Sequence, residues 1–171
     1  GTTLRARVRS TDLGGLSTEQ SFMIQVVVPA VRISEFMASN TSALLDEDND
    51  SSDWIEIFND QNEELNLAGW HLTDNAGDLT QWQFPSRVIP GNGRLVVFAS
   101  AKNRAGANDP ELHTNFNLSS SGEFLALVRP DGQTIVSSYA PVFPPQLADI
   151  SYGLSPSGTI EGLLSPPTPG N

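Results

Sequence analysis

The chain has 171 residues, a length that suits one domain with its own hydrophobic core and a shorter additional segment. Acidic residues outnumber basic residues by 20 to 9, and the net charge of -11 disfavours nucleic acids and anionic lipids as partners, because like charges repel. There is no cysteine, which excludes disulfides, thiolate metal sites and cysteine nucleophiles, and no apolar run reaches membrane-spanning length. We therefore expect no nucleic-acid partner and no membrane insertion.

Strand signals dominate the sequence. Short runs of β-branched and aromatic residues are bounded by Gly, Pro, Asn and Asp, and no window carries a helical apolar stripe. The sequence predicts an all-β fold.

The first predicted element is a β-hairpin. Apolar and basic residues alternate from Leu4 to Arg9, apolar residues alternate again from Phe22 to Val28, and Asp12, Gly14 and Gly15 lie between the two runs. An isolated hairpin leaves one apolar face uncovered. We expect it to pack on or extend the main domain, or to pair with its counterpart in a second chain.

A boundary is predicted at Pro29, where the alternation breaks and a new strand begins. The predicted organisation is a hairpin over residues 1–29, the main domain over 30–164 and a Pro-rich linker over 165–171. Three arginines against two acids give the hairpin a net charge of +1, so the remaining residues carry -12.

An acidic run follows the first strand of the main domain. Nine acids and no base lie between Asp46 and Glu64, which predicts a strongly negative end of the domain. Its D-x-D-x-D opening resembles an oxygen-ligand calcium loop, although Ser51 and Ile57 stand where an EF-hand needs Gly and Glu. An irregular calcium site is one interpretation and a solvated turn is the favoured one. The candidate ligands are Asp46, Asp48, Asp50 and Asp53.

The later strands are marked by turns and by apolar runs. The apolar parity switches at Ala68 and Gly69, which predicts a bend. The runs 95–99 and 124–128 are apolar on both parities, as expected of central strands in a sandwich. Residues 130–132 (PDG) predict a tight turn between two further strands.

Nine sequence blocks occur in the order RISEFMASN (32–40), DWIEIFN (53–59), LNLAGWHLTD (65–74), WQFP (82–85), LVVFAS (95–100), HTNFNL (113–118), GEFLALV (122–128), residues 144–153 and PPTPG (166–170). This series is similar to the bacterial lamin tail domain. This resemblance implies an immunoglobulin-like β-sandwich without catalytic activity, in a secreted bacterial multidomain protein and therefore extracellular or at the cell surface. Some eukaryotic relatives bind DNA, but this chain lacks a basic patch.

The segment 7–28 resembles the closing two strands of a cadherin-like repeat. The calcium-binding linker of such repeats is acidic, whereas residues 27–31 are apolar. We therefore expect no calcium at this junction.

Two acids lie in apolar strand contexts. Strand parity places Glu35 on the face of Ile33 and Met37, and Glu56 on the face of Trp54. Two inward carboxylates could form a general acid and base, but a structural network with arginines or backbone amides is favoured. The available arginines are Arg32, Arg87 and Arg94.

The remaining candidates carry no motif. His71 and His113 are expected in surface or capping roles, and no catalytic residue is assigned. Trp54, Trp70 and Trp82 are expected in the core, with sugar stacking as the alternative. The segment 141–146 (PVFPPQ) is expected as a rigid surface loop with an exposed phenylalanine.

The sequence thus predicts a non-catalytic adhesion, spacer or protein-interaction module that needs no cofactor, unless calcium binds the acidic loop. Expected partners are other proteins, neighbouring domains of the same chain, or a second copy through the hairpin. A carbohydrate-binding module and a calcium-stabilised adhesion domain are the alternatives.

Overall fold

The computed structural model describes residues 2–26, 31–106, 108–155 and 161–171, and all regular elements in these ranges are strands. The predicted all-β fold is confirmed. Among the described residues no helix is long and apolar enough to cross a membrane. The strands are β1 (Thr2–Thr11), β2 (Ser17–Val26), β3 (Val31–Met37), β4 (Asp53–Asn59), β5 (Leu65–Asn66), β6 (His71–Thr73), β7 (Trp82–Gln83), β8 (Val88–Ile89), β9 (Arg94–Ala99), β10 (Leu112–His113), β11 (Leu125–Val128), β12 (Ile135–Tyr139), β13 (Ser151–Leu154) and β14 (Glu161–Leu164).

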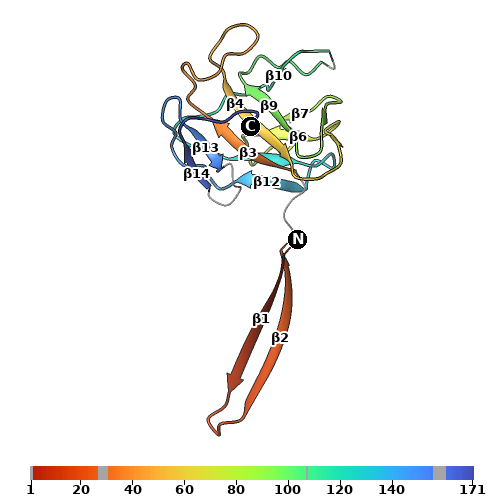
Figure 1. Cartoon of the computed structure of the whole chain (residues 1–171), viewed down its shortest axis with the longest axis vertical. Helices are drawn as coiled ribbons and strands as arrows, with labels where there is room; N and C mark the ends of the chain where they lie inside the picture. Colours follow the sequence, from red (N-terminus) through yellow and green to blue (C-terminus); the bar gives the residue numbers. More distant parts are fainter. Residues whose placement is uncertain (1, 27–30, 107, 156–160) are drawn as a thin grey trace.

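Two sheets form a sandwich (Figure 1). The larger has the order β10-β9-β4-β3-β13-β14 and the smaller β12-β11-β6-β7, while β5 and β8 form a separate pair. Strand alternation places one face of each sheet in a shared core. Phe36 of β3 joins the two layers, because its ring lies 4.9 Å from that of Tyr139 and 4.7 Å from that of Phe143.

A β-bulge in β3 decides which side chains enter the core. Ile33 pairs with Ile57 and Glu35 pairs with Glu56, so Ser34 has no partner in the ladder. The extra residue reverses the parity, and Phe36 joins Ile33 in the core whereas Met37 packs in a separate cluster on the outer face. The predicted common face of Ile33, Glu35 and Met37 is therefore wrong.

Strand β13 approaches this bulge very closely. A Cβ atom on Gly153 would lie 2.3 Å from the carbonyl oxygen of Ser34 and 2.6 Å from the Cα of Glu35. Only glycine fits there. This contact fixes β13, and with it β14 and the C-terminal residues, against β3.

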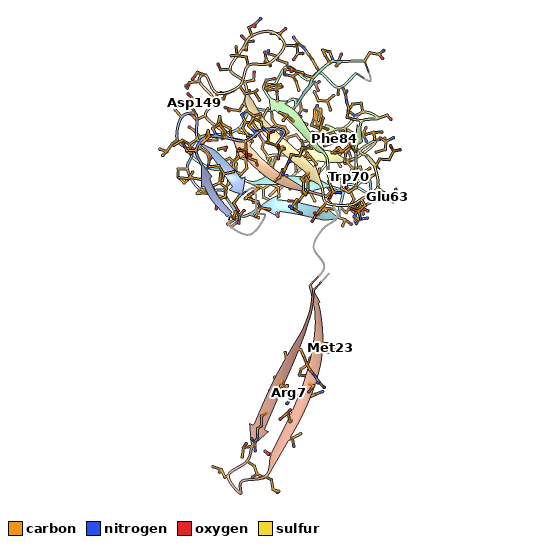
Figure 2. All side chains as sticks on the ribbon, in the orientation of Figure 1. Arg7, Met23, Glu63, Trp70, Phe84 and Asp149 are labelled. Carbon is orange, nitrogen blue, oxygen red and sulfur yellow. The ribbon has the colours of Figure 1, made fainter. Side chains whose placement is uncertain are left out.

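The N-terminal hairpin is confirmed. Strands β1 and β2 pair over ten residues each, with Ala6 opposite Phe22, and Asp12 Oδ1 accepts the N–H groups of Gly14 and Leu16 in the turn. Figures 1 and 2 show the hairpin apart from the sandwich, with Met23 projecting from it. The predicted boundary at Pro29 lies outside the described residues.

Two predicted turns are confirmed and one predicted exposure is wrong. Gly69, with φ of 80°, lies in the bend between β5 and β6, and residues 130–132 join β11 to β12. Phe143 is only 1% exposed, because its ring packs on Phe36 in the core. The surrounding prolines hold the loop while the phenylalanine ring enters the sandwich.

Candidate functional site

The acidic loop between β3 and β4 is built around a buried aspartate. Asp46 Oδ1 accepts the backbone N–H groups of Asp48 and Asp50, each at 3.0 Å, and Oδ2 accepts the Ser52 hydroxyl at 2.7 Å. Asn49 adopts a left-handed conformation with φ of 65°, which closes the turn. The loop therefore has a defined geometry in which three carboxylates converge.

A lysine lies at the centre of this loop. Lys102 Nζ contacts Asp46, Asp48 and Asp50 at 2.7, 2.8 and 2.9 Å. Burial by itself would raise the pKa of Asp46, but the hydrogen bonds from Lys102, Ser52 and the backbone lower this pKa to about 2. These three carboxylates lie close enough to bind a metal ion, and the ammonium group already occupies their common centre.

The fourth predicted calcium ligand has a different environment. Asp53 is not part of the three-carboxylate group and accepts the backbone N–H of Asn40 at 3.0 Å. Burial raises the pKa of Asp53 to about 6. The structure thus brings together three of the four candidate ligands, and calcium binding stays a prediction.

A buried histidine lies beside the acidic loop. His113 has no exposed surface, and its ring stacks on Phe98 at 5.3 Å between centroids. Its Nε2 lies 2.8 Å from Glu47 Oε2, and its Nδ1 lies 2.8 Å from Ser100 Oγ. The serine, histidine and glutamate form a hydrogen-bonded row, but the buried ring cannot reach a substrate. His71 is buried as well, so the predicted surface position is wrong for both histidines.

Two glutamates and an arginine complete this cluster. Glu111 Oε2 accepts the backbone N–H of Glu47 at 2.7 Å, and Arg104 binds Glu47 and Asp48. The hydrogen bond with Glu111, together with those of His113 and Arg104, lowers the pKa of Glu47. Burial and the neighbouring Glu47 raise the pKa of Glu111.

The two strand carboxylates are buried on the outer face of the six-stranded sheet. Glu56 is 0% exposed and accepts hydrogen bonds from Arg94, the Ser34 hydroxyl and the backbone N–H of Gly170. The favoured structural network, including Arg94 as its cation, is confirmed. Its proximity to the C-terminal residues was not predicted.

Glu35 is bound without a cation among the described residues. It is 2% exposed and accepts hydrogen bonds from the Ser151 hydroxyl and from both the N–H and the hydroxyl of Thr168. The segment 165–171, predicted as a linker, thus lies on the sheet and supplies donors to both buried carboxylates.

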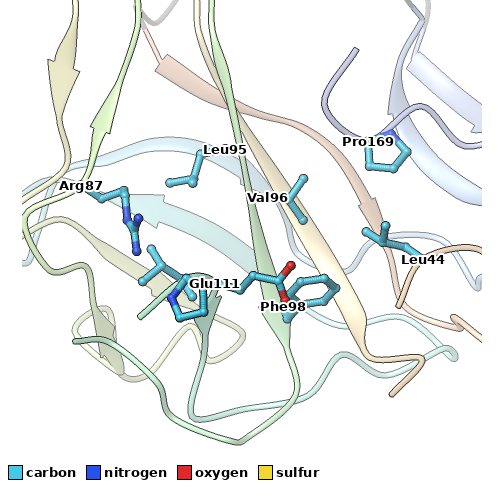
Figure 3. Close-up of a pocket in the computed structure, with 9 residues that line it drawn as sticks. Leu44, Arg87, Leu95, Val96, Phe98, Glu111 and Pro169 are labelled. Atoms are coloured by element: carbon cyan, nitrogen blue, oxygen red, sulfur yellow. The ribbon is translucent and has the colours of Figure 1, made fainter. Parts of the chain in front are cut away.

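A pocket of about 240 Å³ adjoins this segment. Figure 3 shows Pro169 on one side of the pocket and Arg87 on the other. Arg87 donates to the carbonyl oxygen of Asp109 at 2.7 Å. The lining is apolar apart from one arginine and one glutamate, and consists of Leu44, Arg87, Leu95, Val96, Phe98, Pro110, Glu111, Leu112 and Pro169.

All three tryptophans lie in the sandwich and are buried. Trp54 is 0%, Trp70 8% and Trp82 2% exposed, as the core interpretation predicted. A buried indole offers no face to a sugar ring. The described sandwich therefore lacks a tryptophan strip for glycan stacking.

Lys102, Arg104 and Glu111 are site residues that the sequence did not single out. Charge balance is the signal that could have found them, because a run of nine acids without a base needs cations from elsewhere in the chain. Six of the nine acids pair with cations from β3, β9 or the loop after β9. The pairs are Lys102 with Asp46, Asp48 and Asp50, Arg104 with Glu47 and Asp48, Arg94 with Glu56, and Arg32 with Asp60. Four cations thus offset part of the nine negative charges at the predicted negative end.

Comparison with models of known protein families gives a match. The family model described as Lamin Tail Domain matches residues 27–142. No curated protein matches the chain. The matched range includes the acidic loop, Lys102 and the buried histidines, and ends before β13, β14 and the C-terminal segment.

Proposed function

The chain belongs to the lamin tail domain family, and we propose that it is an adhesion or spacer module of a larger secreted bacterial protein. The family has an immunoglobulin-like, non-enzymatic fold and points to protein interaction. The observation that carries the proposal is the burial and hydrogen bonding of three polar side chains. Glu35, Glu56 and His113 are all buried and hydrogen-bonded within the chain, which leaves them unsuited to act on a substrate.

The hairpin is the proposed site of contact with a protein partner. Val8, Phe22 and Met23 are exposed on its strands, and Leu13 and Leu16 are exposed at its turn. Val8 and Phe22 lie on one face of the hairpin and Met23 on the other, because side chains alternate along a strand and Phe22 pairs with Ala6. Exposed apolar residues favour association, because their burial removes apolar surface from water. The proposed partner is a neighbouring domain of the same protein or the hairpin of a second copy.

Two measurements test the non-catalytic proposal. The purified chain is assayed on glycoside, ester, peptide and phosphoester substrates and on a glycan array, and we expect neither turnover nor retention. Turnover that disappears in Glu56→Gln but survives in the loop variant Asp48→Asn would overturn the proposal. Exposure at the cell surface is tested by protease treatment of intact producing cells, which should remove the domain.

Light scattering tests the hairpin contact. A chain that begins at Ala30 is compared with the full chain across a concentration series. We expect a concentration-dependent dimer for the full chain and a monomer for the shortened chain. A full chain that stays monomeric, and loses its first residues rapidly to protease without loss of stability, contradicts pairing between copies.

A further inference from the structure

The C-terminal segment 166–170 (PPTPG) has very few hydrogen-bond donors. Three of its five residues are prolines, which have no backbone N–H. The two remaining N–H groups both bind buried carboxylates: Thr168 N lies 2.9 Å from Glu35 Oε1, and Gly170 N lies 2.6 Å from Glu56 Oε2. The donor pattern of the segment therefore matches the acceptor pattern of the sheet.

The side chain of Thr168 strengthens this match. Its hydroxyl donates to Glu35 Oε2 at 2.6 Å, so both oxygens of one carboxylate bind the same residue. Hydrogen bonds to an ionised carboxylate are roughly twice as strong as neutral ones. Removal of the segment would leave two buried carboxylates short of donors, which is costly.

The prolines suit a short ligand that bends on the sheet, because Pro169 and Gly170 lie in a turn. Proline restricts the backbone, so the segment loses little entropy when it binds. Pro169 lies between the two donor residues and contributes to the apolar pocket beside Leu44, Val96 and Phe98 (Figure 3). Gly170, with φ of 81°, and the hydrogen bond from Asn171 N to the carbonyl oxygen of Thr168 then turn the chain.

We propose that the outer face of the six-stranded sheet is a binding surface for proline-rich peptides that form a turn, and that the segment 166–171 is its resident ligand. The surface recognises a backbone N–H at every second residue, a hydroxyl on the first donor residue and a proline between the two donors. This proposal rests on the proposed interaction function and defines the chemistry of one class of partner.

Release of the resident segment should make the surface available in trans. In the intact chain the segment competes at an effective concentration set by its short connection to β14. A free peptide of the same sequence should therefore bind the unaltered chain weakly. It should bind well once the resident segment is weakened.

The test uses the full chain carrying Thr168→Pro, which removes one N–H and one hydroxyl from the segment and leaves the sheet unchanged. A fluorescent peptide with the sequence of residues 165–171 is titrated, and its anisotropy is measured. We expect a dissociation constant between about 10 µM and 1 mM for the variant, and binding at least about tenfold weaker for the unaltered chain. A matched peptide with N-methylglycine in place of Gly170 lacks only one N–H and should bind at least about tenfold more weakly.

Equal binding of the two peptides, or no binding to Thr168→Pro, would overturn the proposal. If that variant does not fold, a full chain with a specific protease site between Leu164 and Ser165 replaces it. This chain folds with the native segment, is cleaved afterwards and is then titrated against the same criteria. Loss of peptide binding alongside an intact hairpin-dependent dimer would remove this proposal alone, whereas catalytic turnover would remove the proposed function.

Discussion

Two regions of the sandwich bury carboxylates and satisfy them by different means. On the outer face, Glu35 and Glu56 accept hydrogen bonds mainly from hydroxyl and backbone N–H groups. In the acidic loop, the carboxylates gather around the cations Lys102 and Arg104. Neutral donors are directional and fixed by the backbone, whereas ion pairs depend on salt and on protonation. The outer face should therefore be sensitive to side-chain removal, and the loop to salt, pH and competing cations.

The largest effect is expected for Glu56→Ala. The substitution leaves Arg94, the Ser34 hydroxyl and the Gly170 N–H without their shared acceptor. Removal of one member of a buried charged network costs about 3 to 4 kcal/mol of unfolding free energy, measured by urea denaturation. Glu63→Ala, an exposed acid from the same run, is the control and should change stability by less than about 0.5 kcal/mol. A loss below about 1 kcal/mol for Glu56→Ala would contradict the network's importance.

A smaller loss is expected for Lys102→Met, which removes the cation from between three carboxylates. Repulsion among Asp46, Asp48 and Asp50 should lower stability by about 2 kcal/mol. Millimolar calcium should restore the melting temperature by binding where the ammonium was, and Asp48→Asn in addition should abolish the recovery. Lys102→Arg keeps the charge and serves as the control. An unchanged melting curve with calcium and with chelator in Lys102→Met rules out the calcium interpretation.

The pH dependence should have opposite signs at two aspartates. Because the pKa of Asp53 is raised, its protonated form stabilises the folded chain below about pH 3.8. This contribution to the free energy of unfolding is lost as pH rises through about 6. Because the pKa of Asp46 is lowered, its ionised form stabilises the folded chain above about pH 3.8. This contribution to the free energy of unfolding is lost as pH falls through about 2. Asp53→Asn should remove about 1 to 2 kcal/mol of pH-dependent stability between pH 4 and 6. Urea midpoints across a pH series measure this, and identical pH profiles for the two chains would contradict it.

The smallest effect is expected for Arg104→Gln. Its ion pairs with Glu47 and Asp48 are partly exposed, so the loss should stay below about 1 kcal/mol. The loss should shrink further in 0.5 M NaCl, because salt screens exposed charges. Glu35→Gln is the comparison, and its loss should be the same at both salt concentrations. A salt-independent effect of Arg104→Gln would remove the distinction between the two regions.

Local patterns predicted much of this fold. The alternation in β1 and β2, the turn at residues 130–132 and the apolar run of β11 each depend on neighbouring residues and are visible in the sequence. The bulge at Ser34 is not, because its position depends on pairing with β4 and on the close approach of Gly153, more than a hundred residues away. A single inserted residue then reversed the predicted faces.

The acidic residues of the candidate site could be predicted from the sequence, but the cations that pair with them could not. The run from Asp46 to Asp50 predicted a solvated turn, with calcium binding as the alternative, and Lys102 lies 56 residues from Asp46. No local rule joins residues at such a separation. In the same way, the proline-rich stretch 165–171 suggested a linker, because proline content indicates backbone conformation. It does not reveal that the two N–H groups of this stretch bind Glu35 and Glu56.

The order of synthesis adds a consequence for the C-terminal segment. Thr168 follows Glu35 by 133 residues, and Gly170 follows Glu56 by 114. At about 5 to 20 residues per second, roughly 6 to 27 s pass on the ribosome before these donors exist. In that interval Glu56 can already accept hydrogen bonds from Ser34 and Arg94, whereas the groups that bind Glu35, on Ser151 and Thr168, are both made late. Strands β3 to β12 are thus made before β13, β14 and the donors that close the outer face, which are made together.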